Sequence, residues 1–333
     1  MSPGERERQT RLAPGTRVLV TGASGFLASH LLARLIRVDC TILAQSRPQF
    51  NRGLRPLLGS LELLEGGWDE PSTGEKAAAF APQVVFHLSG RTDQTHSREN
   101  DARQFADHLQ TALAVVRAVF RPGLERLVFT ATNEEYGASP VPHAENQREQ
   151  PISAYSAAKT AVTHYLQMLW RSEGLPVIVV RPFLVYGPGQ ARGLVPAVAR
   201  RAFAGEAFDT TEGSQTRDLV FVSDVIDGLL RAATVPGVEG SIFNLGTGVE
   251  TPVRTVVERI VALAGGGTPR FGGLPGRPGE MQHSRAALEK SRRELGWKAR
   301  VSLEEGLGIT LEAMRPPLAG GGRPEGQRPE RRT

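Results

Sequence analysis

The sequence is poor in cysteine and in long apolar runs. Cys40 is the single cysteine among 333 residues, so no disulfide forms within the chain and a thiolate zinc cluster is excluded. No apolar run approaches the roughly 18 residues of a transmembrane helix. Residues 1–17 are polar and lack the apolar middle of a secretory signal. We therefore expect a cytoplasmic protein, and the scattered histidines lead us to expect no metal.

An excess of charge over the body of the chain is also missing. The formal net charge is +5, of which residues 1–17 carry +2 and residues 315–333 carry +3. Both ends are rich in Gly, Pro, Arg and Glu, which predicts disordered tails at 1–16 and 315–333. Because the basicity lies in these tails, we expect neither a nucleic-acid nor a membrane partner. With 40% apolar and 23% charged residues, the remainder has an ordinary globular composition.

Strand and helix patterns alternate through the first half of the chain. Short apolar runs predict strands at 17–21, 40–44, 61–64, 83–88, 125–131 and 175–180, and helical spacing predicts helices at 26–38, 105–120 and 154–171. This alternation predicts an α/β fold, a Rossmann-type doubly wound parallel sheet over residues 17–185. Beyond it, Gly and Pro become frequent and the elements shorter. We expect a smaller mixed α/β lobe that binds substrate at 186–314.

A glycine-containing turn joins the first strand to the first helix. Gly22 suits the tight turn, Gly25 suits a close approach of backbone to a pyrophosphate, and Ala28 allows helix and strand to pack closely. The helix N-terminus adds free N–H groups that favour a phosphate. The turn therefore predicts a dinucleotide site, with contacts from Gly22, Ser24, Gly25, Phe26 and Leu27.

The end of the second strand bears on the cofactor. NAD-binding folds commonly have an acid there that binds the ribose hydroxyls. The segment Leu43–Arg47 has none, and Ser46 and Arg47 offer groups that suit a 2′-phosphate instead. This favours NADP(H), with NAD(H) as the alternative.

A tyrosine and a lysine lie four residues apart in the third predicted helix. Tyr155 and Lys159 share a helix face at this spacing. A phenol with a pKa of about 10 is a poor base, and a neighbouring positive charge lowers that pKa. Thr132 follows a predicted strand, where its hydroxyl can bind the reacting oxygen. The three residues suit proton transfer to or from a sugar hydroxyl, although such pairs are also common on exposed helices.

In combination, these features resemble the extended short-chain dehydrogenase/reductase family that acts on nucleotide sugars. The resemblance covers about residues 17–314. The segments that carry it are Thr21–Phe26, His87–Gly90, Tyr155 with Lys159, Arg181–Gly189, Arg217–Val220 with Asp224–Val225, Asn244–Gly246 and Arg277–Glu280. Four features depart from the family pattern. Ala28 replaces its third glycine, and Leu184 replaces an asparagine that contacts the substrate diphosphate. The usual acid near the adenine is replaced around Gly66-Gly67-Trp68, and the usual asparagine of the fourth helix is not evident near Asp107-His108.

The resemblance implies roles for particular residues and a nucleoside-diphosphate sugar as substrate. Thr132, Tyr155 and Lys159 match the catalytic residues, and Arg217 and Arg277 match residues that hold the diphosphate. Further implied cofactor contacts are Leu88, Ser89, Gly90, Pro182 and Trp68, with Asp69 as an alternative to Trp68 near the adenine. Further implied substrate contacts are Asn133, Leu194 and Val195. A homodimer through helices at about 98–120 and 154–171 is also implied.

The segment after the fifth predicted strand, Thr132-Asn133-Glu134-Glu135-Tyr136-Gly137, bears on the reaction. Dehydratases of the family have Thr-Asp-Glu here, and Asn133 cannot supply their acid, although Glu134 remains a candidate base. Two glutamates before Tyr-Gly look more like the family's 4-ketoreductases. We therefore expect NADPH-dependent reduction of an NDP-4-keto-6-deoxyhexose at C4. The alternatives are an NAD-dependent 4-epimerase, a 4,6-dehydratase and a dinucleotide-binding regulator without catalysis.

Overall fold

A seven-stranded parallel sheet forms the centre of the protein. The computed structural model describes residues 12–91, 97–276 and 279–316. Residues 1–11 and 317–333 of the predicted tails lie outside the described residues, whereas Leu12 is buried in the core and Thr16 begins β1, so the ordered chain starts before residue 17. The strand order is β11-β6-β5-β4-β1-β2-β3. The bounds are β1 Thr16–Thr21, β2 Cys40–Ser46, β3 Glu62–Glu65, β4 Val84–His87, β5 Arg126–Thr130, β6 Val177–Pro182 and β11 Ile242–Leu245. This doubly wound Rossmann sheet confirms the predicted fold class.

Helices cover both faces of the sheet because its strands are apolar on both sides. Along β1, Val18 and Val20 belong to one buried cluster and Leu19 to the other. The first cluster packs under α2 (Phe26–Leu35) and α8 (Val222–Thr234). The second packs under α3 (Pro71–Phe80), α5 (Thr111–Val119) and α6 (Ala154–Glu173). Each fully buried aliphatic side chain contributes about 1.5–3 kcal/mol to such a core.

The helix predicted over 105–120 differs from the one observed. It consists of α4 (Arg98–Phe105), a π-helical turn at Ala106–Gln110 and α5. A wider turn shifts the face that each following residue presents, so the 3.6-residue period does not run through this segment. The π turn places His108 inside the protein, where 3% of it is exposed.

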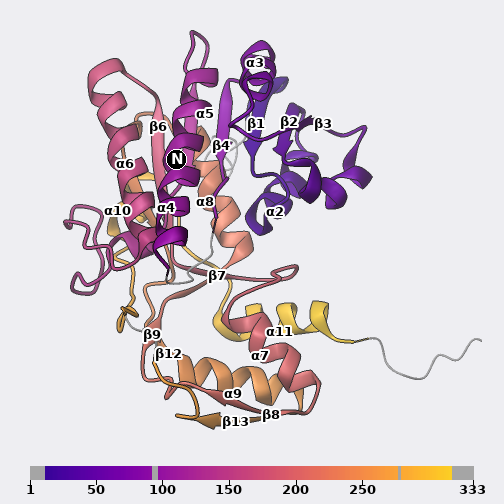
Figure 1. The fold of residues 1–333 in the computed structure, drawn as a ribbon, viewed down its shortest axis with the longest axis vertical. Helices are drawn as coiled ribbons and strands as arrows, with labels where there is room; N and C mark the ends of the chain where they lie inside the picture. The colour runs from indigo at the N-terminus through magenta and orange to yellow at the C-terminus, as the bar shows by residue number, and fades with distance from the viewer. Residues whose placement is uncertain (1–11, 92–96, 277–278, 317–333) are drawn as a thin grey trace, which may run out of the picture.

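A smaller lobe lies below the sheet in Figure 1 and contains α7, α9, β8 and β13. Its elements, with the pieces that connect it to the sheet, are β7 Leu184–Tyr186, α7 Leu194–Phe203, β8 Ala207–Thr210, β9 Thr216–Arg217, β10 Leu219–Phe221, β12 Thr251–Pro252, α9 Val253–Ala264, β13 Thr268–Phe271, α10 Glu289–Glu294 and α11 Leu303–Met314. After this lobe begins, α8 and β11 return to the sheet. The domain boundary at 185/186 therefore stays a prediction.

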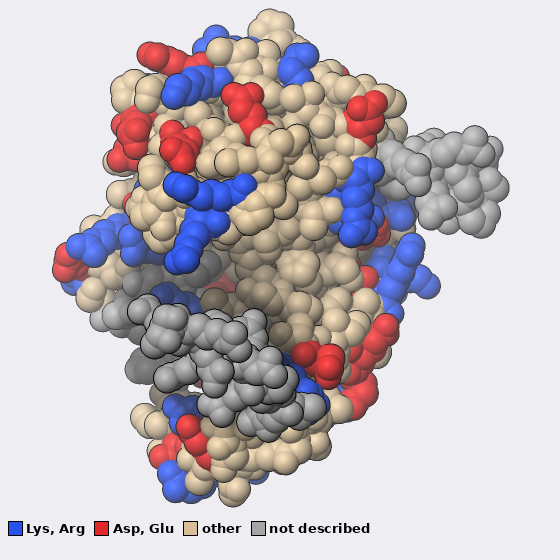
Figure 2. Space-filling model, turned by 90° about the vertical axis from the view of Figure 1, so that its right-hand side faces the viewer, with Lys and Arg blue, Asp and Glu red and all other residues tan. Residues whose placement is uncertain are grey.

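The surface carries both signs of charge. On the face in Figure 2, Lys and Arg side chains lie interspersed with Asp and Glu. Among the described residues, none of the helices has the length and apolar character needed to cross a membrane.

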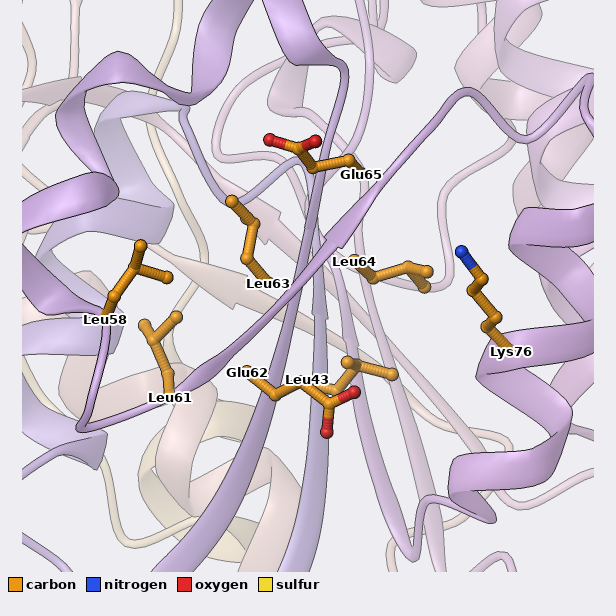
Figure 3. A pocket seen from close by; sticks show the side chains of 8 residues that line it. All are labelled: Leu43, Leu58, Leu61, Glu62, Leu63, Leu64, Glu65 and Lys76. Carbon is orange, nitrogen blue, oxygen red and sulfur yellow. The ribbon is translucent and has the colours of Figure 1, made fainter.

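A cavity of about 550 Å³ lies beside β3, the edge strand of the sheet (Figure 3). Its lining consists mainly of leucines with three charged side chains: Leu43, Leu58, Leu61, Glu62, Leu63, Leu64, Glu65 and Lys76. None of the residues predicted for cofactor or substrate is among them. Many of the predicted site residues lie instead in the turns that follow the parallel strands.

Candidate active site

The predicted site residues gather at one edge of the sheet. Gly22–Leu27 follow β1, Arg47 follows β2, Leu88–Gly90 follow β4 and Thr132 follows β5. These four strands are parallel neighbours in the order β5-β4-β1-β2. Their carboxyl ends therefore lie side by side, which is where doubly wound folds bind ligands.

The glycine turn has the geometry of a dinucleotide site. Gly22 has φ +65°, and a Cβ atom there would lie 2.8 Å from the Ser89 Cα. Gly25 is the N-cap of α2, whose first turn, beginning with Phe26 and Leu27, has no side-chain cap. The uncapped N–H groups and the helix dipole favour a diphosphate at this end. The residues present thus fit a dinucleotide, with Ser24 exposed on the turn.

Gln45, near the end of β2, binds the glycine turn, a role that the sequence motifs did not predict. The Gln45 Oε1 accepts hydrogen bonds from Gly22 N at 3.1 Å and from Trp68 Nε1 at 3.0 Å. Trp68 is only 8% exposed and packs in the core, so its indole supports the turn from beneath. Ser46 is buried and its hydroxyl donates to the Arg47 carbonyl, whereas the Arg47 side chain is exposed. Of the two residues predicted to meet a 2′-phosphate, Arg47 is the accessible one.

A buried histidine links the turns after β1 and β4. Thr21 Oγ1 lies 2.8 Å from the His87 Nδ1 and also accepts from Ser89 N at 3.3 Å. The Thr21 hydroxyl thus joins the imidazole to the backbone of the loop after β4. Burial, followed by the charge of Lys159, lowers the pKa of His87 to about 3. His87 is therefore neutral and fixes the loop that carries Leu88, Ser89 and Gly90.

Lys159 lies at the centre of the site. Its Nζ donates to the Thr130 carbonyl at 2.8 Å and lies 4.8 Å from the centre of the Phe129 ring. A Cβ atom on Gly90 would lie 2.6 Å from His108 Cε1 and 3.3 Å from this Nζ, so the glycine leaves room for both side chains. Burial lowers the pKa of Lys159 to about 8, and Glu135 opposes this shift.

Tyr155 is half-buried at the start of α6, where Ser153 caps the helix with a capping box. Its ring meets His108 edge-on, with 5.5 Å between ring centres. Burial, with a further contribution from Glu134, raises the pKa of the phenol, and a hydrogen bond with Thr132 opposes the rise. This direction is opposite to the one expected from the sequence, because burial and the Glu134 charge dominate. The Lys159 ammonium donates to the Thr130 carbonyl.

The turn after β5 carries the remaining polar groups. Thr132 is 6% exposed and caps the turn Asn133–Glu135, its Oγ1 accepting from Glu134 N at 3.2 Å. Asn133 is buried, and its amide donates to Ser284 Oγ at 3.0 Å. The site thus brings Thr132 and Tyr155 together, with the Glu134 charge acting on the phenol.

The predicted substrate contacts are more dispersed. Arg217 pairs with Glu280 at 2.6 Å and donates to the Met281 carbonyl. Leu194 and Val195 begin α7, where Val195 is buried at 2% exposure. Pro182 ends β6. Arg277 lies outside the described residues.

Several residues that shape the site were missed by the sequence interpretation. Gln45 and His87 support the cofactor turns, and His108 and Glu135 act on Tyr155 or Lys159. Glu135 had a sequence signal as the second of two adjacent glutamates, and His87 belongs to the segment His87–Gly90, although no role was expected for it. The roles of Gln45 and His108 depend on contacts between distant segments, which the local hydrophobic pattern does not reveal.

Comparison with known proteins identifies the family to which the chain belongs. The model of the NAD dependent epimerase/dehydratase family matches residues 18–246. The UDP-glucose 4-epimerase of Mycolicibacterium smegmatis is 31% identical, covering 90% of this chain and 98% of the relative.

Two solved structures are similarly related. UDP-glucose 4-epimerase of Thermotoga maritima with UDP-glucose has a TM-score of 0.82 at 28% identity, covering 90% of this chain and 99% of that one. The Thermus thermophilus UDP-glucose 4-epimerase complex with NAD has a TM-score of 0.80 at the same identity and coverage. The chain therefore belongs to the NAD-dependent epimerase/dehydratase family, the nucleotide-sugar branch of the extended short-chain dehydrogenases/reductases.

Proposed function

We propose that the protein is a 4-epimerase of a nucleoside-diphosphate hexose. The observation that carries the proposal is the meeting of Thr132 and Tyr155 beside the buried ammonium of Lys159, at the sheet edge that carries the glycine turn. Asn133 supports epimerisation over dehydration, because its amide is bound to Ser284 and offers no acid for a leaving hydroxyl. The resemblance to UDP-glucose 4-epimerases supports this reading over the 4-ketoreductase expected from the sequence.

The chain's residues supply binding and proton transfer. The uncapped start of α2 would hold the cofactor diphosphate. A bound oxidised nicotinamide would supply a reversible acceptor for the hydride from C4, and its positive charge would lower the pKa of the nearby phenol. Tyr155 takes the proton of the C4 hydroxyl as a carbonyl forms and gives it back when the carbonyl is reduced on its other face. Thr132 orients that oxygen, and Lys159 balances the phenolate charge.

The test is a product analysis with UDP-glucose and catalytic NAD. We expect UDP-galactose to form until equilibrium, with no net change in absorbance at 340 nm. The Tyr155→Phe variant serves as the control for contaminating epimerase. A failure of every tested NDP-hexose to change at C4, with the cofactor bound, would contradict the proposal.

A 4-ketoreductase is the second candidate, and Glu134–Glu135 before Tyr136–Gly137 favours it. The same residues would protonate a carbonyl oxygen instead of exchanging its proton. The raised pKa of Tyr155 suits a proton donor. Stoichiometric NADPH consumption with an NDP-4-keto-6-deoxyhexose, combined with no epimerisation of NDP-hexoses, would favour the reductase. A dinucleotide-binding regulator would show neither reaction.

We further propose that the cofactor site accepts NADP(H) as well as NAD(H). The exposed Arg47 at the end of β2, together with an amide rather than an acid at Gln45, supports this reading. A homodimer is proposed from α4, α5 and α6, where Phe105, Leu113 and Met168 are 42%, 39% and 42% exposed. Sedimentation of the purified protein and a thermal-shift comparison of NAD with NADP test these two proposals.

A further inference from the structure

A buried carboxylate lies beneath the catalytic helix without reaching the substrate side. Glu135 is fully buried at the end of the turn that begins with Thr132. Both of its carboxylate oxygens accept from Thr163 Oγ1, at 3.0 and 3.2 Å. Thr163 is four residues after Lys159 in α6, so the two side chains share a helix face one turn apart. The carboxylate therefore sits one helical turn from the lysine.

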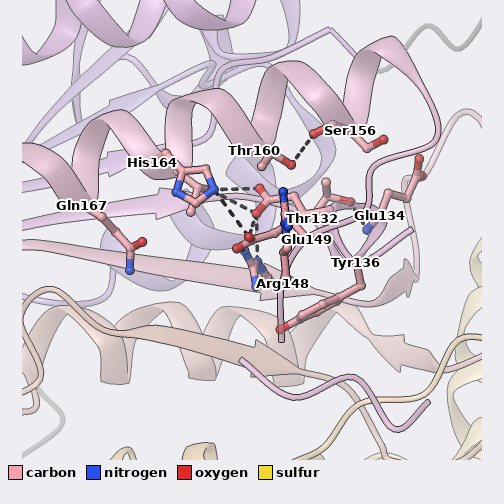
Figure 4. Close-up of polar contacts among 12 residues, drawn as sticks. Thr132, Glu134, Tyr136, Arg148, Glu149, Ser156, Thr160, His164 and Gln167 are labelled. Carbon is pink, nitrogen blue, oxygen red and sulfur yellow. Dashed lines mark hydrogen bonds and ion pairs between the residues drawn. The ribbon is translucent and has the colours of Figure 1, made fainter. Parts of the chain in front are cut away.

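The other partners of Glu135 come from the neighbouring strand. Arg181 at the end of β6 is fully buried and approaches Glu135 Oε2 with Nε at 2.9 Å and Nη2 at 2.7 Å. The same Nη2 binds Glu149 at 2.6 Å, and the guanidinium stacks on Tyr136. Glu149 lies on the outer side, next to His164 of α6 (Figure 4). Arg181 thus joins two carboxylates, an inner one below α6 and an outer one near the surface.

The groups around Lys159 explain why this arrangement matters. His87 from β4 and His108 from the π turn both have a pKa lowered to about 3, so they are neutral. Tyr155, on the same helix, is a neutral phenol whose pKa is raised. Glu135 is the carboxylate that acts on the ammonium. The charge of Lys159 is therefore balanced by a carboxylate that is held on the same helix through Thr163.

We propose that Glu135 is a positioning residue: its carboxylate is the counter-charge that keeps Lys159 protonated, and it ties the Thr132 turn to α6. Glu149 shares the same arginine but does not have this role. Removing the charge of Glu135 while keeping its shape would release the proton of Lys159 at lower pH. The consequence for turnover rests on the proposed function, whereas the charge of Lys159 can be measured without any substrate.

The experiment is a titration of lysine-selectively ¹³C-labelled protein by NMR. The chain has four lysines, Lys76, Lys159, Lys290 and Lys298, and Lys159→Arg assigns the signal. We expect Glu135→Gln to lower the pKa of Lys159 by roughly one unit, from a Coulomb interaction over about one helical turn. Glu149→Gln is the matched control and should leave it unchanged. Thr163→Val, which frees the carboxylate from α6, should lower it by less.

Turnover gives a second readout that a purely structural role would not move. The alkaline limb of the kcat–pH profile should move to lower pH in Glu135→Gln and return in Glu135→Asp. An unchanged Lys159 titration in a folded Glu135→Gln variant would overturn the proposal, as would equal shifts in the Glu135 and Glu149 variants. If Glu135→Gln does not fold, an unmoved titration in Thr163→Val overturns it instead. A shifted titration in a protein without epimerase activity would refute the proposed function and leave the role of Glu135 standing.

Discussion

Replacing Gly22 by alanine tests the cofactor turn, because two separate costs can be read from the structure. The residue has φ +65°, a region that costs an alanine about 1 kcal/mol. The added Cβ would also meet Ser89 Cα at 2.8 Å and Ser89 N at 2.9 Å. Since both are backbone atoms, the turn itself must shift, at about 1–3 kcal/mol. The total of roughly 2–4 kcal/mol corresponds to a decrease in Tm of roughly 3–6 °C for a chain of this length.

The chain contains a matched control for this variant. Gly15 has φ +74°, but nothing lies within 4 Å of the position of its Cβ. The only cost of Gly15→Ala should therefore be the backbone strain, which should lower Tm by about 1–2 °C. The assay is thermal unfolding with and without NAD, where saturation at 100 times Kd adds about 2.7 kcal/mol to the wild type. Gly15→Ala should keep this gain and Gly22→Ala should lose most of it. A Gly22→Ala variant that keeps the full gain would refute the placement of the diphosphate at this turn.

Four further predictions address other parts of the site. Tyr155→Phe should lower kcat by about 10²–10⁴-fold while NAD still raises Tm, and unchanged turnover would remove the tyrosine from the mechanism. The pKa of Lys159 falls from 10.5 to about 8 on folding, so the unfolded state binds more protons between about pH 8 and 10.5, and the cost of burying the charge is complete below pH 8. Lys159→Met should therefore stabilise the fold by up to about 3 kcal/mol in urea unfolding at pH 7, with less gain near pH 10. Arg47→Ala should weaken NADP binding by calorimetry and spare NAD; equal losses would contradict the 2′-phosphate assignment. Leu113→Glu should give a monomer in sedimentation if α5 lies in a dimer interface, and an unchanged mass would exclude that face.

The strands were predictable because their local composition matches their final environment. Runs such as Val18–Val20 and Val84–Phe86 are apolar and buried on both faces, and a glycine turn follows where the first strand ends. The helix α3 was missed because its first turn, Pro71-Ser72-Thr73-Gly74, is polar and contains two poor helix formers. The π turn was missed because one wider turn does not change the residue composition.

The candidate site was predictable only where its residues share short motifs. Thr132, Tyr155 and Lys159 come together as expected. Thr132 follows the end of β5, and the first turns of α6, which carry Tyr155 and Lys159, lie beside that strand end. The direction of the Tyr155 pKa was not predictable, since the burial that raises it depends on packing across the sheet. The Glu135–Arg181 pair joins residues 46 positions apart and has no local pattern.

Transfer of isotope at C4 tests the central claim most directly. UDP-glucose deuterated at C4 is incubated with the protein and catalytic NAD, and the UDP-galactose is analysed by mass spectrometry. If one cofactor molecule removes and returns the hydrogen within the site, the product keeps its deuterium at C4 and no NADH accumulates. Product that has lost the deuterium, or formation of product only with stoichiometric NADPH, would contradict the assignment as a 4-epimerase.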